Sequence, residues 1–189
     1  MARLWIVFIA SLLAFNALAE DGAGHGDEER PIKVGSAALP FGPLAVINQT
    51  DAGAAHLTFS GKPSGKSHVT VLSFFAEWCA GCVNELPVLK DLDALYRNRG
   101  VQVVTVSVDR EKDATHKLRE MITREGLHHT VALDPSSAVL RRYQGENQSL
   151  PYLFVIGPDG VVADLHEGFG PGTEPELRKV IDRLLTPTP

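Results

Sequence analysis

Between Val69 and Cys82 the chain reads VTVLSFFAEWCAGC. The first half, from Val69 to Phe75, is a short run of mainly apolar and β-forming residues, which predicts a buried strand. The second half brings two cysteines, Cys79 and Cys82, to the beginning of a segment with helical periodicity. The stretch therefore predicts a strand whose end delivers a Cys-x-x-Cys pair to the first turn of a helix, the usual place for a site in an open α/β sheet.

Strand and helix patterns alternate after this stretch. A helix is expected over residues 80–98, where apolar residues recur at three- and four-residue steps, and Gly100 follows as a stop. Further strands are expected at 101–108, 130–133, 152–156 and 161–166, and further helices at 112–125, 136–143 and 174–185. This order predicts an α/β fold with a mixed central sheet flanked by helices. Strand-like pieces at 44–47 and 56–59 predict an N-terminal β extension.

The composition is that of a soluble globular protein. The 189 residues are 44% apolar and 22% charged, which suits one folded domain, predicted here over residues 34–186. The formal net charge of −5 argues against a nucleic-acid partner or an anionic membrane surface.

The first nineteen residues have the features of a secretory signal. Arg3 supplies the positive start, an apolar run follows, and Ala17-Leu18-Ala19 has the small-x-small form of a cleavage site before Glu20. Residues 20–33 are expected to form a polar, flexible tail. We expect a periplasmic or otherwise extracytoplasmic protein that is soluble after cleavage; an uncleaved signal that anchors the chain to the membrane is the alternative.

The cysteine pair favours chemistry over scaffolding. Export places Cys79 and Cys82 where disulfides persist, but a bridge across so short a loop adds little stability. The positive end of a helix lowers the pKa of a thiol such as that of Cys79 below its free value of about 8.5. The resulting thiolate attacks a partner disulfide, and Cys82 then releases the product. Such a protein needs no cofactor besides its own redox-active disulfide.

Metal binding is the main alternative from another class. A structural metal site normally needs four ligands, and one Cys-x-x-Cys supplies two. His128 and His129 are conceivable further ligands, so a periplasmic copper or zinc carrier stays open as a hypothesis, although no metal site is predicted. Hydrolysis by Cys79 would need a nearby histidine base, which the local sequence does not supply.

From Val69 onward the chain resembles the thioredoxin superfamily. The run from Phe74 to Cys82 is similar to the thioredoxin active-site segment. Three further features agree: Pro87 in the helix, Leu150-Pro151 before an apolar strand, and the turn Pro158-Asp159-Gly160. The export signal, the N-terminal extension and the strand at 101–109 most resemble the TlpA/ResA branch of extracytoplasmic thiol–disulfide oxidoreductases, which are generally reductants.

This resemblance implies roles for individual residues. Cys79 would be the attacking thiol and Cys82 the resolving one. Trp78 would cover the pair and shape the partner-binding surface, with plain core packing as the alternative. Pro151, if its peptide bond is cis, would present the backbone of Leu150 to an extended peptide; from periodicity alone it is a proline at the start of a strand.

The acid–base partner is a separate question. Thioredoxins keep a buried aspartate six residues before the first cysteine, and here that position is Ser73. The ResA-like branch can use an acidic residue after the following strand, which points to Asp109 as the group that takes the proton from Cys82. The alternative is that Asp109 caps the next helix.

The resemblance also implies partners. A ResA-like protein would reduce disulfides in envelope proteins, including apocytochrome c cysteines during cytochrome c biogenesis, and would draw electrons from a membrane thiol relay. A disulfide-introducing oxidase would use the same pair in the opposite direction. Ala80 and Gly81 replace the proline-containing pairs common between such cysteines, so the sequence leaves the direction of electron flow open.

Overall fold

The computed structural model describes residues 32–48, 55–146 and 148–186. The predicted signal peptide lies outside these ranges, as does the predicted tail up to residue 31. Ile32, predicted to belong to the flexible tail, is buried instead, and its N–H donates to the carbonyl of Tyr143 at 2.8 Å, so the packed domain begins before residue 34. The elements are β1 (Phe41–Val46), β2 (His56–Phe59), β3 (Val69–Phe75), α1 (Ala80–Tyr96), a 3₁₀ turn (Arg97–Arg99), β4 (Val101–Ser107), α2 (Ala114–Glu125), β5 (Thr130–Leu133), α3 (Ala138–Gln144), β6 (Tyr152–Ile156), β7 (Val162–Glu167) and α4 (Thr173–Leu185). No described helix is both long and apolar enough to cross a membrane.

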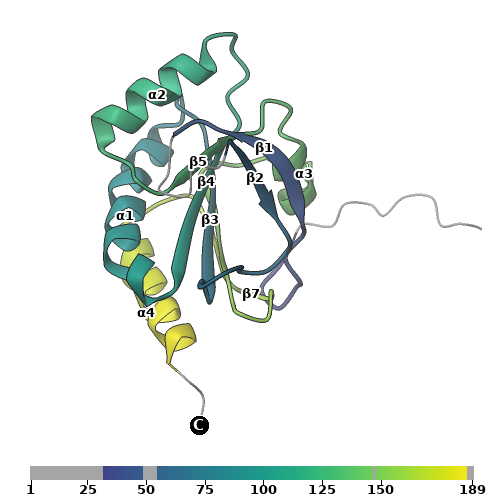
Figure 1. Ribbon diagram of the computed structural model, residues 1–189, viewed down its shortest axis with the longest axis vertical. Coiled ribbons are helices and arrows are strands. Elements are labelled where there is room, and N and C mark those ends of the chain that lie inside the picture. Colours follow the sequence, from purple (N-terminus) through teal and green to yellow (C-terminus); the bar gives the residue numbers. More distant parts are fainter. Residues whose placement is uncertain (1–31, 49–54, 147, 187–189) are drawn as a thin grey trace, which may run out of the picture.

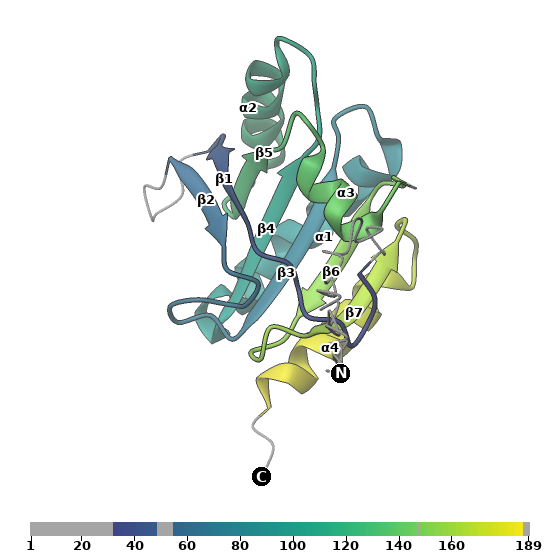
Figure 2. The same ribbon diagram turned by 90° about the vertical axis from the view of Figure 1, so that its right-hand side faces the viewer.

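The seven strands form one mixed sheet in the order β2-β1-β5-β4-β3-β6-β7. Strand β4 pairs in parallel with β3 and β5, whereas β6 pairs antiparallel with β3 and β7. The expected mixed sheet is confirmed: β3, β4 and β5 pair in parallel, and the last two strands, β6 and β7, pair antiparallel. Helices α1, α2 and α4 cover one face of the sheet and α3 covers the other (Figures 1 and 2).

Strand β3 lies in the centre of the sheet and is buried along its whole length. Because side chains alternate between the faces of a strand, Val69 and Val71 pack into the cluster that contains residues of α1 and α4. Leu72 and Phe74 belong to the other cluster, which includes the apolar side of α3. Ser73 therefore shares the face of Val71 and points toward α1.

Helix α1 begins where the sequence predicts. Cys79 is its N-cap, with an extended backbone, and the helix ends at Tyr96 before the 3₁₀ turn rather than at residue 98. Gly100 stops the segment in the left-handed region, with φ of 91°. Leu95 is 49% exposed, and Asp93, four residues after Leu89, occupies a buried position instead.

Helix α3 is anchored to the sheet through Tyr143. The Tyr143 ring packs against Phe74 and Phe154 at centroid distances of 5.5 and 5.0 Å. Its hydroxyl donates to the carbonyl of Leu39 at 2.5 Å, so the buried phenol is satisfied. The end of α3, where Gln144 follows Tyr143, is thereby fixed relative to the central strands.

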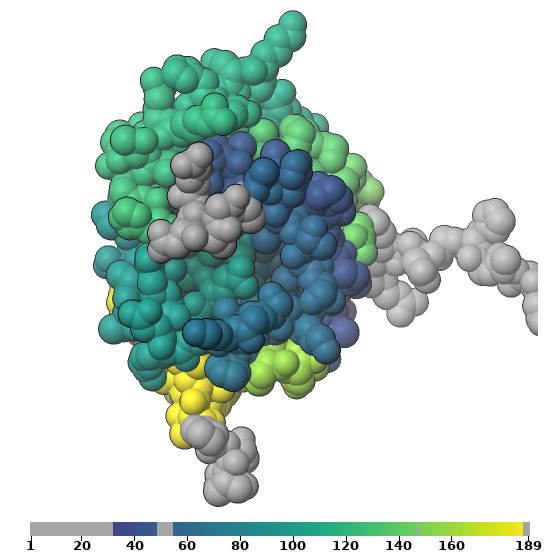
Figure 3. Space-filling view, viewed as in Figure 1, coloured from purple at the N-terminus to yellow at the C-terminus, as the bar shows by residue number. Residues whose placement is uncertain are grey.

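The predicted N-terminal β extension is confirmed. Strand β1 pairs antiparallel with β2 and with β5, so the hairpin widens the sheet at one edge. Strand β1 begins three residues earlier than the expected 44–47, at Phe41, because Phe41 is buried against Phe59 of β2 at a centroid distance of 5.3 Å. The hairpin lies at the molecular surface in the view of Figure 3.

His129, just before β5, is buried as a neutral ring. Its Nε2 lies 2.7 Å from the hydroxyl of Thr105, and its Nδ1 has no partner among the described residues. Burial lowers the pKa of His129 from 6.5 to about 4, with smaller contributions from the charges of Arg97 and His128. The folded state therefore binds fewer protons than the unfolded chain between these two values.

We expect His129→Gln to flatten the acid limb of the stability curve. The contribution of the neutral His129 ring to the free energy of unfolding is fully present above pH 6.5 and is lost as the pH is lowered toward 4, by about 3 kcal/mol for a shift of this size. Denaturant unfolding at pH 7 and pH 4 measures the difference between variant and wild type. The matched control is His56→Gln, at an exposed position on β2 whose charge does not contribute to the pKa of His129. An equal loss in wild type and His129→Gln would contradict the assignment.

Candidate active site

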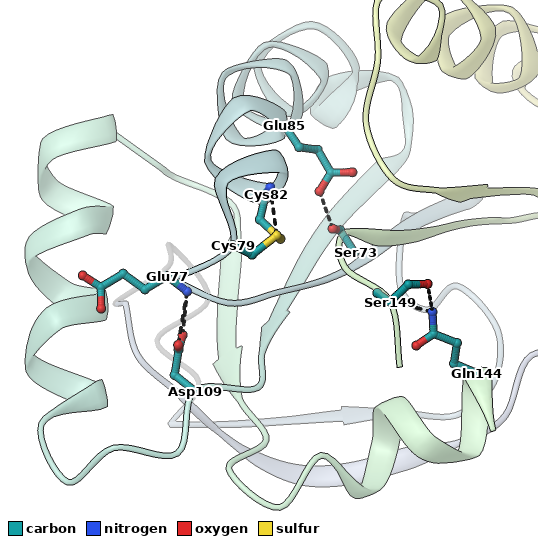
Figure 4. Close-up of a disulfide and its surroundings, with 8 residues drawn as sticks. All are labelled: Ser73, Glu77, Cys79, Cys82, Glu85, Asp109, Gln144 and Ser149. Atoms are coloured by element: carbon teal, nitrogen blue, oxygen red, sulfur yellow. Dashed lines mark hydrogen bonds between the residues drawn. A yellow bond between two sulfur atoms is a disulfide. The ribbon is translucent and has the colours of Figure 1, made fainter. Parts of the chain in front are cut away.

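The two cysteines form a disulfide at the start of α1 (Figure 4). Cys79 is 8% exposed and Cys82 is fully buried, so a partner can reach only the first sulfur. The backbone N–H of Cys82 donates to Cys79 Sγ at 3.1 Å. This bond and the positive end of the helix stabilise negative charge on Cys79 Sγ once the disulfide is reduced. The predicted order, Cys79 attacking and Cys82 resolving, fits this geometry.

Trp78 lies on the surface beside the pair. Its side chain is 68% exposed, so the alternative of core packing is wrong. Trp78 lines a cavity of about 330 Å³ together with Leu150, Val108 and Leu140, and Arg110 and Glu111 supply charged groups to its wall. Two residues predicted to bind the partner, Trp78 and Leu150, therefore border one cavity, and Trp78 directly precedes Cys79 in the chain.

The predicted proline loop also reaches the pair. The Leu150–Pro151 peptide bond is cis, as the resemblance implied. A Cβ placed on Gly81 would lie 3.3 Å from Pro151 Cδ, so the proline ring packs closely over the Cys-x-x-Cys turn. The close approach gives a physical reason for the smallest residue at position 81.

The structure reveals an acid that sequence reasoning missed. Glu85 lies one helical turn after Cys82 and is 1% exposed. Its Oε2 accepts a 2.7 Å hydrogen bond from the hydroxyl of Ser73, and its Oε1 has no partner among the described residues. Desolvation raises the pKa of Glu85 from 4.5 to about 7, against a smaller lowering by the Ser73 hydrogen bond.

Two features of the sequence could have identified this acid. Ser73 interrupts the apolar face of a strand that is otherwise expected to be buried. Glu85 lies in the same helical stripe as Cys82, Leu86 and Leu89, all of which are buried. A carboxyl in a buried stripe requires a partner, and a hydroxyl on the facing strand supplies one.

Asp109 lies on another side of the cysteine loop (Figure 4). It is 2% exposed, and both of its carboxylate oxygens lie 3.1 Å from the backbone N–H of Glu77. The hydroxyl of Ser107 donates to Oδ2 at 2.8 Å. Helix α2 begins five residues later, at Ala114, and its N-cap is Asp113. Asp109 therefore holds the loop that precedes Cys79, and the bonds it makes are not those of a cap on α2.

The described part of the chain offers no set of ligands that would support the alternative of a metal carrier. Residues 32–48, 55–146 and 148–186 contain no group of three or more His, Cys, Asp or Glu side chains arranged to hold a metal ion. His129, one of the conceivable ligands, is bonded to Thr105 inside the core.

Comparisons with known proteins agree with this site. The model of the AhpC/TSA family matches residues 49–165. Thiol-disulfide oxidoreductase ResA of Bacillus subtilis is 31% identical over 97 residues, 51% of this chain and 51% of the relative. ResA of Geobacillus thermodenitrificans is 30% identical over 142 residues, 75% of this chain and 73% of the relative. The chain spans about half the length of ResA from Geobacillus kaustophilus and Bacillus subtilis in those matches.

Solved structures share the fold. A Chlorobium tepidum protein assigned as thiol:disulfide interchange protein DsbE is similar with a TM-score of 0.67 and 28% identity, over 82% of this chain and 99% of that one. StoA of Bacillus subtilis has a TM-score of 0.57 at 20% identity, over 78% and 98%, which supports the fold alone. The chain belongs to the AhpC/TSA family of the thioredoxin fold, with thiol-disulfide oxidoreductases of the ResA type among its relatives.

Proposed function

We propose that this protein is an extracytoplasmic thiol–disulfide oxidoreductase that reduces disulfides in other proteins. The observation that carries the proposal is the disulfide between an accessible Cys79 and a buried Cys82 at a helix start, beside Trp78 and the Pro151 loop. An accessible sulfur next to an exposed aromatic surface suits a polypeptide partner rather than a small metabolite enclosed in a deep pocket.

The reaction balances as two exchange steps. In the reduced protein, the Cys79 thiolate attacks one sulfur of the partner disulfide, forming a mixed disulfide and releasing the other partner sulfur as a thiolate. Cys82 then loses its proton, and its thiolate attacks Cys79 Sγ. The mixed disulfide breaks, the second partner thiolate leaves, and two electrons have passed from this protein to the partner.

Glu85 is the proposed acceptor of the Cys82 proton. The two residues are three positions apart on α1, which places their side chains on the same face of the helix. A carboxyl with a pKa near 7 is ionised often enough to accept a proton at neutral pH and protonated often enough to return it. Asp109, to which the sequence pointed as the proton acceptor, is proposed to hold the loop before Cys79 in place instead. It does so by accepting from the backbone N–H of Glu77, next to Trp78.

The cellular setting follows from the predicted signal at residues 1–19. We propose that the protein acts in the bacterial envelope on disulfide-containing proteins, with apocytochrome c as one such substrate. Relatives named ResA and the DsbE-type structural neighbour support this setting. A membrane thiol relay would return the Cys79–Cys82 pair to its reduced form.

A redox titration separates the reductant from the oxidase that would use the same pair. The purified domain is equilibrated in buffers of graded potential, and the free thiols are alkylated and counted by mass. We expect a midpoint near that of thioredoxin, about −270 mV, and a value near about −120 mV would instead assign the protein as a disulfide-introducing oxidase.

A further inference from the structure

A hydrogen-bonded group that runs from a buried glutamine to an exposed glutamate lies behind the loop that faces the cysteines. It consists of Gln144 at the end of α3, Ser149 in the loop, and Glu167 at the end of β7. We name these three residues the Ser149 clamp. Figure 4 shows Gln144 and Ser149 joined on the side of the loop away from α1.

Gln144 makes two bonds to one residue. Its Nε2 donates to the carbonyl oxygen of Ser149 at 3.0 Å and to the Ser149 hydroxyl oxygen at 2.8 Å. A carbonyl oxygen only accepts, so the amide nitrogen must face Ser149. The Ser149 hydroxyl in turn donates to Glu167 Oε1. One serine is thus held from a helix and from a strand.

The clamp acts next to the residues that meet a partner. Ser149 immediately precedes Leu150 and Pro151, and Pro151 packs against Gly81 in the Cys-x-x-Cys turn. On the other side, the N–H of Gly168, which follows Glu167, donates to the carbonyl of Pro151 at 2.8 Å. The same short segment is therefore fixed on both sides of the Leu150–Pro151 bond.

If Gln144 served only to fill space, its buried amide would cost free energy that an apolar side chain would not. It is 5% exposed, and its Oε1 has no hydrogen-bond partner among the described residues. A buried acceptor that loses water and gains no bond costs free energy, whereas an apolar side chain of the same length would not carry this cost. The two hydrogen bonds from Gln144 to Ser149, rather than its packing, therefore explain why a glutamine occupies this buried position.

We propose that Gln144 is a positioning residue for partner binding, which acts through Ser149 on the backbone of Leu150. This inference rests on the proposed exchange with protein disulfides. The clamp would then determine the affinity for an extended partner. The reactivity of the Cys79 thiolate would be determined separately, by the start of α1. Loss of the clamp therefore raises KM for a protein disulfide and leaves the reaction with a small disulfide unchanged.

The test uses Gln144→Met, which keeps the length of the side chain and removes its hydrogen bonds. Two rates are measured for the reduced protein: reduction of insulin, giving kcat and KM, and reaction with the small disulfide DTNB. We expect KM for insulin to rise about tenfold, because the released loop must be ordered again when a partner docks, with kcat and the DTNB rate within about twofold of wild type. The thermal midpoint should change little, because the loss of the two bonds to Ser149 and the removal of the unpaired Oε1 act in opposite directions.

Two further variants complete the test. Ser149→Ala loses the bonds made through the hydroxyl but keeps the bond from Gln144 Nε2 to the backbone carbonyl of residue 149, so its KM should rise less than that of Gln144→Met. The effects of the two substitutions should be less than additive in the double variant, because they share the bond between Gln144 Nε2 and the Ser149 hydroxyl. Gln102→Met, a glutamine substitution on β4 outside the clamp, should leave all values unchanged.

The inference is overturned if Gln144→Met keeps the wild-type KM, or if its DTNB rate falls as much as its insulin rate. If wild type reacts with DTNB but does not reduce insulin, the proposed function fails instead.

Discussion

Glu85→Gln is expected to make the protein more stable at pH 8 and at the same time much less active. Glu85 is buried with one carboxylate oxygen unpaired, and its pKa is raised to about 7. Glutamine keeps the shape and can still accept the Ser73 hydrogen bond, but it carries no charge and takes up no proton. The variant therefore removes two effects that are measured separately. The free energy of unfolding reports the cost of burying the carboxylate, and the reaction rate reports its role as a proton acceptor.

The sign of the stability effect follows from proton binding. Below pH 4.5, Glu85 is protonated in both the folded and the unfolded state, so its charge costs nothing. Between pH 4.5 and 7 the unfolded chain ionises at this residue first, so the contribution of Glu85 to the free energy of unfolding falls as the pH rises. Above pH 7 the loss is complete and amounts to about 3 kcal/mol. Denaturant unfolding of the oxidised proteins at pH 4 and pH 8 should show this gain for Glu85→Gln relative to wild type.

The activity of Glu85→Gln should fall because Cys82 loses its proton acceptor. A positioned base contributes about 100-fold or more to such a step, so resolution of the mixed disulfide at pH 8 should slow by at least this factor. The wild-type pH profile should show an inflection near 7 that the variant lacks. Asp91→Asn, at an exposed carboxylate on the same helix, is the matched control. An unchanged pH profile in Glu85→Gln would reject Glu85 as the acceptor.

Cys82→Ala should abolish turnover and accumulate the mixed disulfide with a partner. The attacking sulfur of Cys79 remains, but the buried thiol that releases the product is gone. We expect turnover of insulin to fall by more than about 1,000-fold, because the two cysteines act as one unit. A covalent adduct should appear on a non-reducing gel and disappear with dithiothreitol. Turnover close to the wild-type rate would show that Cys82 does not resolve the intermediate.

Much of the fold could be predicted because local patterns and the final packing agree. Strands β2, β3, β5 and β6 have the predicted boundaries, since short apolar runs bounded by turns leave little choice of register. The starts of two helices differ from the predicted positions. Helix α2 begins at Ala114 rather than at residue 112, and α3 begins at Ala138 rather than at 136, because Asp134 satisfies the first N–H groups of α3 at Ala138 and Val139.

The parts of the candidate site that lie within one short motif were predicted from the sequence. The parts that consist of residues brought together by the fold were missed. The cysteine pair, Trp78 and the Leu150–Pro151 loop each have a short motif. The partnership of Ser73 with Glu85 joins a strand to a helix twelve residues later, and the Ser149 clamp joins a helix, a loop and a strand. No spacing rule links such residues, because their proximity is produced by the whole sheet.

The central claim is that Cys79 attacks a partner disulfide and Cys82 resolves the product. The most direct measurement is mass mapping of the adduct that Cys82→Ala forms with insulin. The account predicts a single disulfide-linked peptide that joins Cys79 to an insulin cysteine, and no adduct in a variant that also carries Cys79→Ala. Failure of reduced Cys82→Ala to form any adduct with insulin would contradict the account.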